Sequence, residues 1–126
     1  MNNEIGSTSA APAAIGPYSQ AVKANGFVFT SGQVPIVPET GKIECDDIEG
    51  QTEQVMKNLE AVLKAAGSDF SKVVKAIIYL KDLGHFTKVN EIYGVRFPKD
   101  PPARACFQVA KLPLDCLVEI EMTALV

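Results

Sequence analysis

Four side chains near the end of the chain have the types and spacing for carboxylate recognition and proton transfer. Arg104 and Cys106 alternate with apolar residues in one stretch typical of a strand, and Glu119 and Glu121 do so in a second. Side chains two apart on a strand share a face, so each pair projects to one side. A loop at residues 112–115 joins the two stretches, which predicts that they lie antiparallel and adjacent. The guanidinium and the two carboxylates would then share a face.

The arginine is the strongest candidate of the four. Its guanidinium offers a planar fork of N–H donors that matches a carboxylate in a bidentate manner, and it stays charged at any working pH. The competing interpretation is an ion pair with Glu119 or Glu121 that only fixes strand register. Glu119 is the candidate proton-transfer group, because partial burial can move a carboxyl pKa towards neutral pH, and Glu121 competes for that role.

Cys106 could act as a nucleophile, because a cation two residues away can lower a thiol pKa. No histidine base is near it in the sequence, so a small buried thiol is the favoured interpretation. The three cysteines show no CxxC spacing, and His85 is the only histidine. This indicates neither a zinc site nor a disulfide framework, and a reducing compartment fits best. Cys45 and Cys116 are interpreted as structural.

Three further polar residues lie next to the ends of expected elements, namely Tyr18, Ser31 and Asn90. Taken alone, each is better explained by capping or turn stabilisation. Tyr93 has helical spacing from Asn90, which favours a place in the core over a place in a pocket.

The chain is expected to form one domain, residues 1–126, with residues 1–11 as a flexible tail. Asn25-Gly26 between apolar runs predicts a hairpin with a type I′ turn. The remaining expected elements are a loop over 32–47, a helix over 48–66, a strand over 73–81, a helix over 85–97 and the two strands already described, within 101–109 and 117–122.

The first expected helix has complete end signals. Asp46 or Asp47 can cap its N-terminus, Gly67 can occupy the C′ position, and two acid-first pairs, Glu53/Lys57 and Glu60/Lys64, lie four residues apart. The strand after it is expected to bury Val74, Ala76, Ile78 and Leu80. In the second helix, Phe86, Val89, Tyr93 and Phe97 form the expected inner stripe.

The element order β-β-α-β-α-β-β predicts an α+β fold, with one mixed β-sheet and two helices on a single face. The other face would carry Arg104, Cys106, Glu119 and Glu121 beside apolar neighbours such as Ile77. A monomer would leave this mixed surface uncovered, so a partner is expected on it.

Composition excludes several classes of function. Apolar residues make up 47% and charged residues 21%, and the net charge is −3 with scattered Lys and Arg, so a nucleic-acid surface is not expected. The N-terminus resembles neither a secretory signal nor a transit peptide, and no apolar run approaches the ~20 residues of a membrane span. We expect a cytoplasmic protein.

Several segments together resemble the RidA (YjgF-type) family of enamine/imine deaminases. They are Pro-Ala-Arg-Ala-Cys at 102–106, Val-Ala-Lys-Leu-Pro at 109–113, Val-Glu-Ile-Glu at 118–121, and the landmarks at 13–21, 30–33 and 89–93. The resemblance implies a chorismate-mutase-like fold and a homotrimer with sites between subunits. The sequence departs from the family pattern at Pro101, where many relatives carry an aromatic residue. This difference would alter one wall of the pocket.

The resemblance also implies a reaction, the hydrolysis of 2-imino acids and their enamines to 2-keto acids and ammonia without a cofactor or metal. Arg104 would bind the substrate carboxylate, backbone groups at Cys106 would hold the substrate nitrogen or the attacking water, and Glu119 would take the water-linked acid/base role. Tyr18, Ser31 and Asn90 would line the site. The alternatives are a ribonuclease or translation inhibitor, and a non-catalytic small-carboxylate binding or holdase protein.

Overall fold

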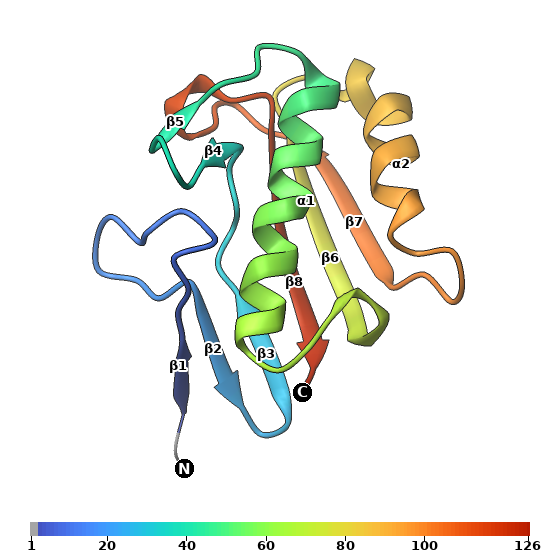
Figure 1. Ribbon diagram of the computed structural model, residues 1–126. Helices are drawn as coiled ribbons and strands as arrows, with labels where there is room; N and C mark the ends of the chain where they lie inside the picture. Colours follow the sequence, from blue (N-terminus) through green and yellow to red (C-terminus); the bar gives the residue numbers. More distant parts are fainter. Residues whose placement is uncertain (1–2) are drawn as a thin grey trace.

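The computed structural model describes residues 3–126 as a mixed β-sheet covered on one face by two helices (Figure 1). The six-stranded sheet has the order β1-β2-β3-β8-β6-β7, in which only β6 and β7 are parallel neighbours. The α+β fold class predicted from the sequence is confirmed. The strands are β1 (Glu4–Gly6), β2 (Ala21–Ala24), β3 (Phe27–Thr30), β6 (Val73–Leu80), β7 (Ala103–Gln108) and β8 (Val118–Leu125).

The covering helices are α1 (Ile48–Ala65) and α2 (Phe86–Val95). The predicted loop over 32–47 contains a small two-stranded sheet of β4 (Ile36–Val37) and β5 (Lys42–Ile43). Three single 3₁₀ turns, Phe70–Lys72, Leu83–His85 and Pro113–Asp115, connect the larger elements.

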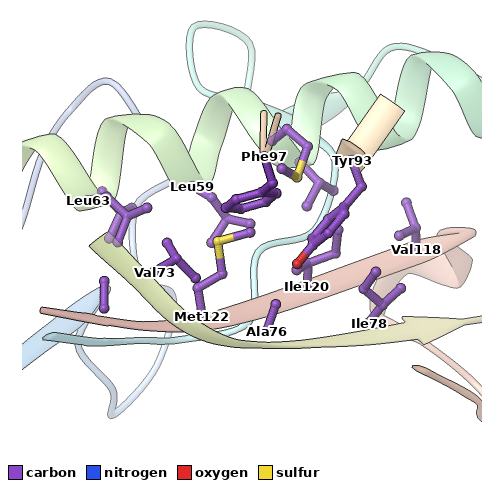
Figure 2. Packing of buried hydrophobic residues seen from close by; sticks show 14 of the residues in the cluster. Leu59, Leu63, Val73, Ala76, Ile78, Tyr93, Phe97, Val118, Ile120 and Met122 are labelled. Atoms are coloured by element: carbon purple, nitrogen blue, oxygen red, sulfur yellow. The ribbon is translucent and has the colours of Figure 1, made fainter. Parts of the chain in front are cut away.

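The hydrophobic core lies between the helices and the sheet (Figure 2). Leu59 and Leu63 of α1 and Ile78 and Ile120 of the sheet are fully buried. Burial of each such side chain stabilises the fold by about 1.5–3 kcal/mol. The apolar residues with helical spacing in α1 and the alternating apolar residues in β6 and β8 therefore pack against one another in one core.

Local turn and cap signals are realised as the sequence predicts. Asn25 and Gly26 both have positive φ, 53° and 82°, as a type I′ turn requires. The Asp47 carboxylate accepts a hydrogen bond from the Gly50 amide at 2.7 Å, and Gly67 ends α1 with a φ of 83°. Of the two predicted acid-first pairs, only the Glu60/Lys64 pair forms.

Glu53, the acid of the other predicted pair, contacts the residue that follows the second helix. Both carboxylate oxygens of Glu53 accept hydrogen bonds from Arg96, which follows α2, one of them at 3.1 Å. The prediction of a Glu53/Lys57 pair is wrong, because a bidentate guanidinium partner is stronger than a lysine on the same helix face. This contact ties α1 to the end of α2.

The predicted flexible tail, residues 1–11, is wrong for most of its length. Met1 and Asn2 lie outside the described residues, but Glu4–Gly6 pair antiparallel with Ala21–Lys23 of β2. Gln20 accepts from the Thr8 amide at 2.7 Å and donates to the Pro12 carbonyl at 2.7 Å. The buried Gln20 side chain thus holds the N-terminal segment in place. The small and polar residues of that segment gave no sign of this order.

Two other boundaries differ from the prediction. Val74 is exposed and Val73 buried, because the pairing of β6 with β8 shifts register between Val73 and Lys75. His85 belongs to the 3₁₀ turn before α2, and Phe97, beyond the end of α2, is still buried.

The largest difference concerns the strands that carry the candidate site residues. β6 lies between β7 and β8, so these two strands are not neighbours. Ala76 of β6 pairs with Arg104 on one side and with Met122 on the other, which directs Arg104 to the helix face. Tyr79 pairs with Glu119, which faces the uncovered side. The predicted shared face of arginine and carboxylates is wrong.

Candidate active site

Arg104 lies in a hollow on the helix side of the sheet edge. The hollow is lined by residues of α2, of the turn after it and of β7: Asn90, Tyr93, Gly94, Phe97, Pro101, Pro102 and Arg104. The guanidinium carbon is 5.4 Å from the Phe86 ring centroid and 5.1 Å from that of Tyr93. None of the ion pairs found within residues 3–126 includes Arg104, so no acid there occupies its N–H fork.

Two more polar atoms belong to this hollow. The Asn90 Oδ1 and the Tyr93 hydroxyl are buried and have no hydrogen-bond partner among the described residues. Burial raises the pKa of Tyr93 to about 12, with Arg104 acting in the opposite direction, so the hydroxyl stays protonated at neutral pH. Tyr93 packs in the core, as expected, and also lines the hollow, which its helical spacing did not reveal.

Cys106 follows Arg104 on the same face of β7 and is partly buried against the core. Burial raises the pKa of its thiol, and the nearby Arg104 only partly offsets this. The side chain is therefore a thiol at neutral pH, which disfavours a nucleophilic role.

Glu119 lies in a second hollow, on the other side of the sheet. Its lining comes from the segment before β2, from the segment after β3 up to β4, from the turn before β8 and from β8 itself: Tyr18, Ser31, Gly32, Val34, Ile36, Pro113, Leu114 and Glu119. Burial, and secondarily the charge of Glu121, raise the pKa of the Glu119 carboxyl. A raised pKa suits a carboxyl group that exchanges protons nearer neutral pH.

Gly32 provides the space that the Glu119 carboxyl group occupies. A Cβ at this glycine would lie 2.9 Å from Cδ of Glu119, and closer still to Oε2. No other residue type fits at position 32 without moving the carboxylate. Gly32 lies within the sequence landmark at 30–33, but the sequence did not indicate this role.

Tyr18 and Ser31 enter the same hollow from segments that are tied together. The Ser31 hydroxyl donates to the Ser19 carbonyl at 2.5 Å, and the Ser31 amide donates to the Gln20 carbonyl at 2.9 Å. Ser31 therefore has the structural role that its position alone suggested, and it also lines the hollow. Tyr18 is half exposed beside it.

Glu121 differs from Glu119 in its partner. The Tyr79 hydroxyl donates to Oε2 of Glu121 at 3.2 Å, and burial together with this carboxylate raises the Tyr79 pKa. No such donor contacts Glu119 within the described part of the chain. The geometry therefore favours Glu121 as a structural acceptor and Glu119 as the carboxyl group open to a ligand.

The six candidate residues thus form two groups. Asn90 and Arg104 line the first hollow, and Cys106 lies beside Arg104 on the same face of β7. Tyr18, Ser31 and Glu119 line the second hollow, on the opposite face. Across residues 3–126, no cluster of three or more His, Cys, Asp or Glu side chains is placed to hold a metal ion. None of the helices in that range has the length and apolar character needed to cross a bilayer.

Comparison with known proteins decides the family. The family model described as Endoribonuclease L-PSP matches residues 8–126. Reactive Intermediate Deaminase A, chloroplastic, of Arabidopsis thaliana is 54% identical over 98% of this chain and 66% of that protein. The chain belongs to this family, which is the Rid family of reactive intermediate deaminases and their relatives.

Solved Rid structures agree with the fold throughout. The Rid family protein YyfA of Yersinia pestis superimposes with a TM-score of 0.97 at 45% identity, covering 99% of this chain and all of that one. E. coli TdcF, solved with bound serine, gives 0.93 at 40% identity, with 98% of each chain covered. The resemblance to RidA noted from the sequence is confirmed, and a deaminase is among the relatives.

Proposed function

We propose that this Rid protein hydrolyses 2-imino acids, in equilibrium with their enamines, to 2-keto acids and ammonia. The observation that carries the proposal is the state of Arg104, whose guanidinium faces a hollow without an acidic partner in the described chain. Such a fork is suited to the carboxylate that every 2-imino acid carries. The Arabidopsis deaminase and the serine bound to E. coli TdcF support a small amino-acid-like substrate.

The roles follow from the chemistry of hydrolysis. Water adds to the C=N carbon, the nitrogen leaves as ammonia, and the carbon becomes a ketone. Arg104 binds the substrate carboxylate, backbone groups at Cys106 hold the imine nitrogen or the water, and Glu119 transfers the proton. The site around the substrate is lined by Tyr18, Ser31 and Asn90. Holding water in line with the imine carbon supplies most of the rate enhancement, and no cofactor or metal is required in this scheme.

The two hollows face opposite ways, so the complete site requires a second subunit. In a cyclic trimer each interface joins two different surfaces of the chain, one from each neighbour. The Arg104 hollow of one subunit would meet the Glu119 hollow of the next. The uncovered sheet face, with Phe29 and Phe107 about half exposed, gives such an assembly apolar area to bury. The homotrimer is therefore part of the proposal.

A partition assay tests the reaction. A threonine or serine dehydratase, a PLP-dependent enzyme that releases such imines, is run with semicarbazide as a competing trap. Adding the Rid protein should raise the share of free keto acid, and Arg104→Ala should abolish that effect. An unchanged partition with wild-type protein refutes the deaminase proposal.

Subunit mixing tests where the site lies. Arg104→Ala and Glu119→Gln homotrimers should each be inactive, and exchange between them assembles about one interface in four from two intact halves. Recovery of up to about a quarter of wild-type activity supports a site between subunits. A double variant mixed with either single variant is the matched control, because it supplies no intact partner half. No recovery in the first mixture contradicts the shared site.

The family description raises an RNA-cleaving role, and the same protein preparation can test it. With a net charge of −3, the chain lacks the concentrated positive charge that phosphate binding uses. RNA binding that weakens steeply with salt, together with an unchanged imine partition, would favour that role. Tight binding of a small carboxylate without turnover would instead favour the non-catalytic alternative.

The cytoplasmic location expected from the sequence stays a prediction. The Arabidopsis relative is named chloroplastic, so membership of the family does not fix the compartment.

A further inference from the structure

The guanidinium of Arg104 lies between two aromatic rings of one helix. Its carbon is almost equidistant from the ring centroids of Phe86 and Tyr93, at 5.4 and 5.1 Å. Both distances fall within the ~6 Å over which a ring face attracts a cation. Phe86 and Tyr93 are seven residues apart on α2, which puts them two turns apart on the same side of the helix.

This arrangement differs from the usual way of holding an arginine. An acidic partner would fix the side chain by occupying two of its five N–H donors and neutralising its charge, which weakens its attraction for a ligand carboxylate. A ring face attracts the positive charge without accepting those donors in the plane of the fork. The two rings can therefore restrict the long side chain and leave its N–H edges available.

Phe86 has an exposure that core packing does not explain. It is 37% exposed, whereas Val89 and Tyr93 on the same helix are 1% and 4% exposed. A large apolar side chain left this open at the N-terminus of α2 contributes little to the core. Its ring instead lies next to the Arg104 guanidinium.

We propose that Phe86 and Tyr93 are positioning residues that orient the Arg104 fork towards its ligand carboxylate. The inference rests on the proposed role of Arg104 and adds residues that act through it. The contribution comes from the ring faces, so the Tyr93 hydroxyl, which has no partner among the described residues, is dispensable for it.

Substitutions at Phe86 separate the ring face from simple bulk. Phe86→Leu keeps an apolar side chain and removes the ring, whereas Phe86→Tyr keeps the ring. Leu83→Ala is the matched control, because Leu83 is also an exposed apolar residue, in the 3₁₀ turn just before α2, and has no ring to face the guanidinium. Tyr93→Phe keeps the second ring in the core and removes only its hydroxyl, so it tests whether the ring face alone is sufficient.

The readout is the Kd of 2-oxobutanoate, a small 2-keto acid, measured by calorimetry at a fixed trimer concentration. Phe86→Leu should raise Kd about fivefold, as expected when a contact of about 1 kcal/mol is lost. Phe86→Tyr, Tyr93→Phe and Leu83→Ala should bind within about twofold of wild type. In ¹⁵N NMR, the ring-current shift of the Arg104 Nε–H signal should decrease in Phe86→Leu alone.

Each other outcome refutes one particular step. If Phe86→Leu binds and shifts like wild type while Arg104→Ala abolishes binding, the positioning role is wrong and the carboxylate site stands. Equal weakening by Phe86→Leu and Leu83→Ala also refutes it, because the effect is then general. If Arg104→Ala binds like wild type, Arg104 is not the carboxylate ligand, and both the proposed function and this inference fail.

Discussion

Replacing Gly32 by alanine tests the catalytic role of Glu119 without touching Glu119 itself. A Cβ at position 32 would lie 2.9 Å from Cδ and 3.2 Å from Cγ of that glutamate. Comfortable carbon–carbon contact begins at about 3.5–4.0 Å, so the carboxyl group must move by about 1 Å. The φ of Gly32 is not positive, so its backbone accepts alanine without strain.

The expected loss is in turnover. A displacement of about 1 Å in a reacting group can cost on the order of a hundredfold in rate, or about 2.7 kcal/mol of barrier. Arg104 lies on the other face of the sheet and keeps its position, so binding of a keto-acid ligand should stay within about twofold. The free energy of unfolding should change by about 1 kcal/mol or less, because a flexible side chain absorbs the clash.

The assay is imine partition with wild type, Gly32→Ala, Glu119→Gln and the double variant. The double variant should be no slower than the slower single variant, because both changes disable the same group. Gly41→Ala is the control for a glycine replacement without a clash, since nothing lies within 4 Å of its Cβ position in a turn outside both hollows. Because Gly41 has a φ of 70°, alanine there should lower the free energy of unfolding and leave turnover unchanged. Turnover of Gly32→Ala within twofold of wild type, with Glu119→Gln inactive, would refute the placement of the carboxylate.

Four further predictions follow from the same geometry. Arg104→Lys should lose almost as much imine hydrolysis as Arg104→Ala, since an ammonium cannot offer two parallel donors, and near-normal activity of an intact lysine trimer would show that the fork is not required. Glu119→Gln should lower kcat more than ligand affinity, whereas Glu121→Gln should not, and equal effects in steady-state kinetics would show that the assigned roles are wrong. Sedimentation should give a trimer of the 13.5 kDa chain, and a stable monomer at micromolar concentration would contradict it. Burial raises the Glu119 pKa in the folded protein above its ordinary value of 4.5, so wild type should lose stability as the pH rises from that value to the raised pKa. Glu119→Gln cannot ionise at this position, so its free energy of unfolding, measured in urea, should increase relative to that of wild type over the same pH range.

Local signals in the sequence predicted local structure well. The Asn25-Gly26 turn, the Asp47 cap and the apolar stripe of α1 each depend on residues close in the chain, and all three form as expected. The position of the N-terminal segment depends instead on Gln20, whose hydrogen bonds reach back 8 to 12 residues. No periodicity in residues 1–11 contains that information.

The candidate site residues were proposed from the sequence, and the structure arranges them differently from the sequence prediction. A short loop between two alternating stretches favours a hairpin, and here β6 separates them because the crossover through α2 makes β6 and β7 parallel neighbours. Alternation gives the two faces of a strand but does not say which one meets the helices. For that reason Arg104 and Glu119 were predicted on the same face and lie on opposite faces.

The central place of β8 has a consequence for synthesis of the protein. β8 pairs with β3 on one side and β6 on the other, so within the described sheet it alone provides the strand pairing between the N-terminal hairpin and the β6-α2-β7 unit. A ribosome releases residues 118–125 after all other strands, and pairing of Phe29 with Thr123 must close a loop of more than ninety residues. The nascent chain therefore holds two sheet fragments with exposed edges until its last strand emerges. A translation stall or premature stop before Val118 would leave both fragments to chaperones and proteases.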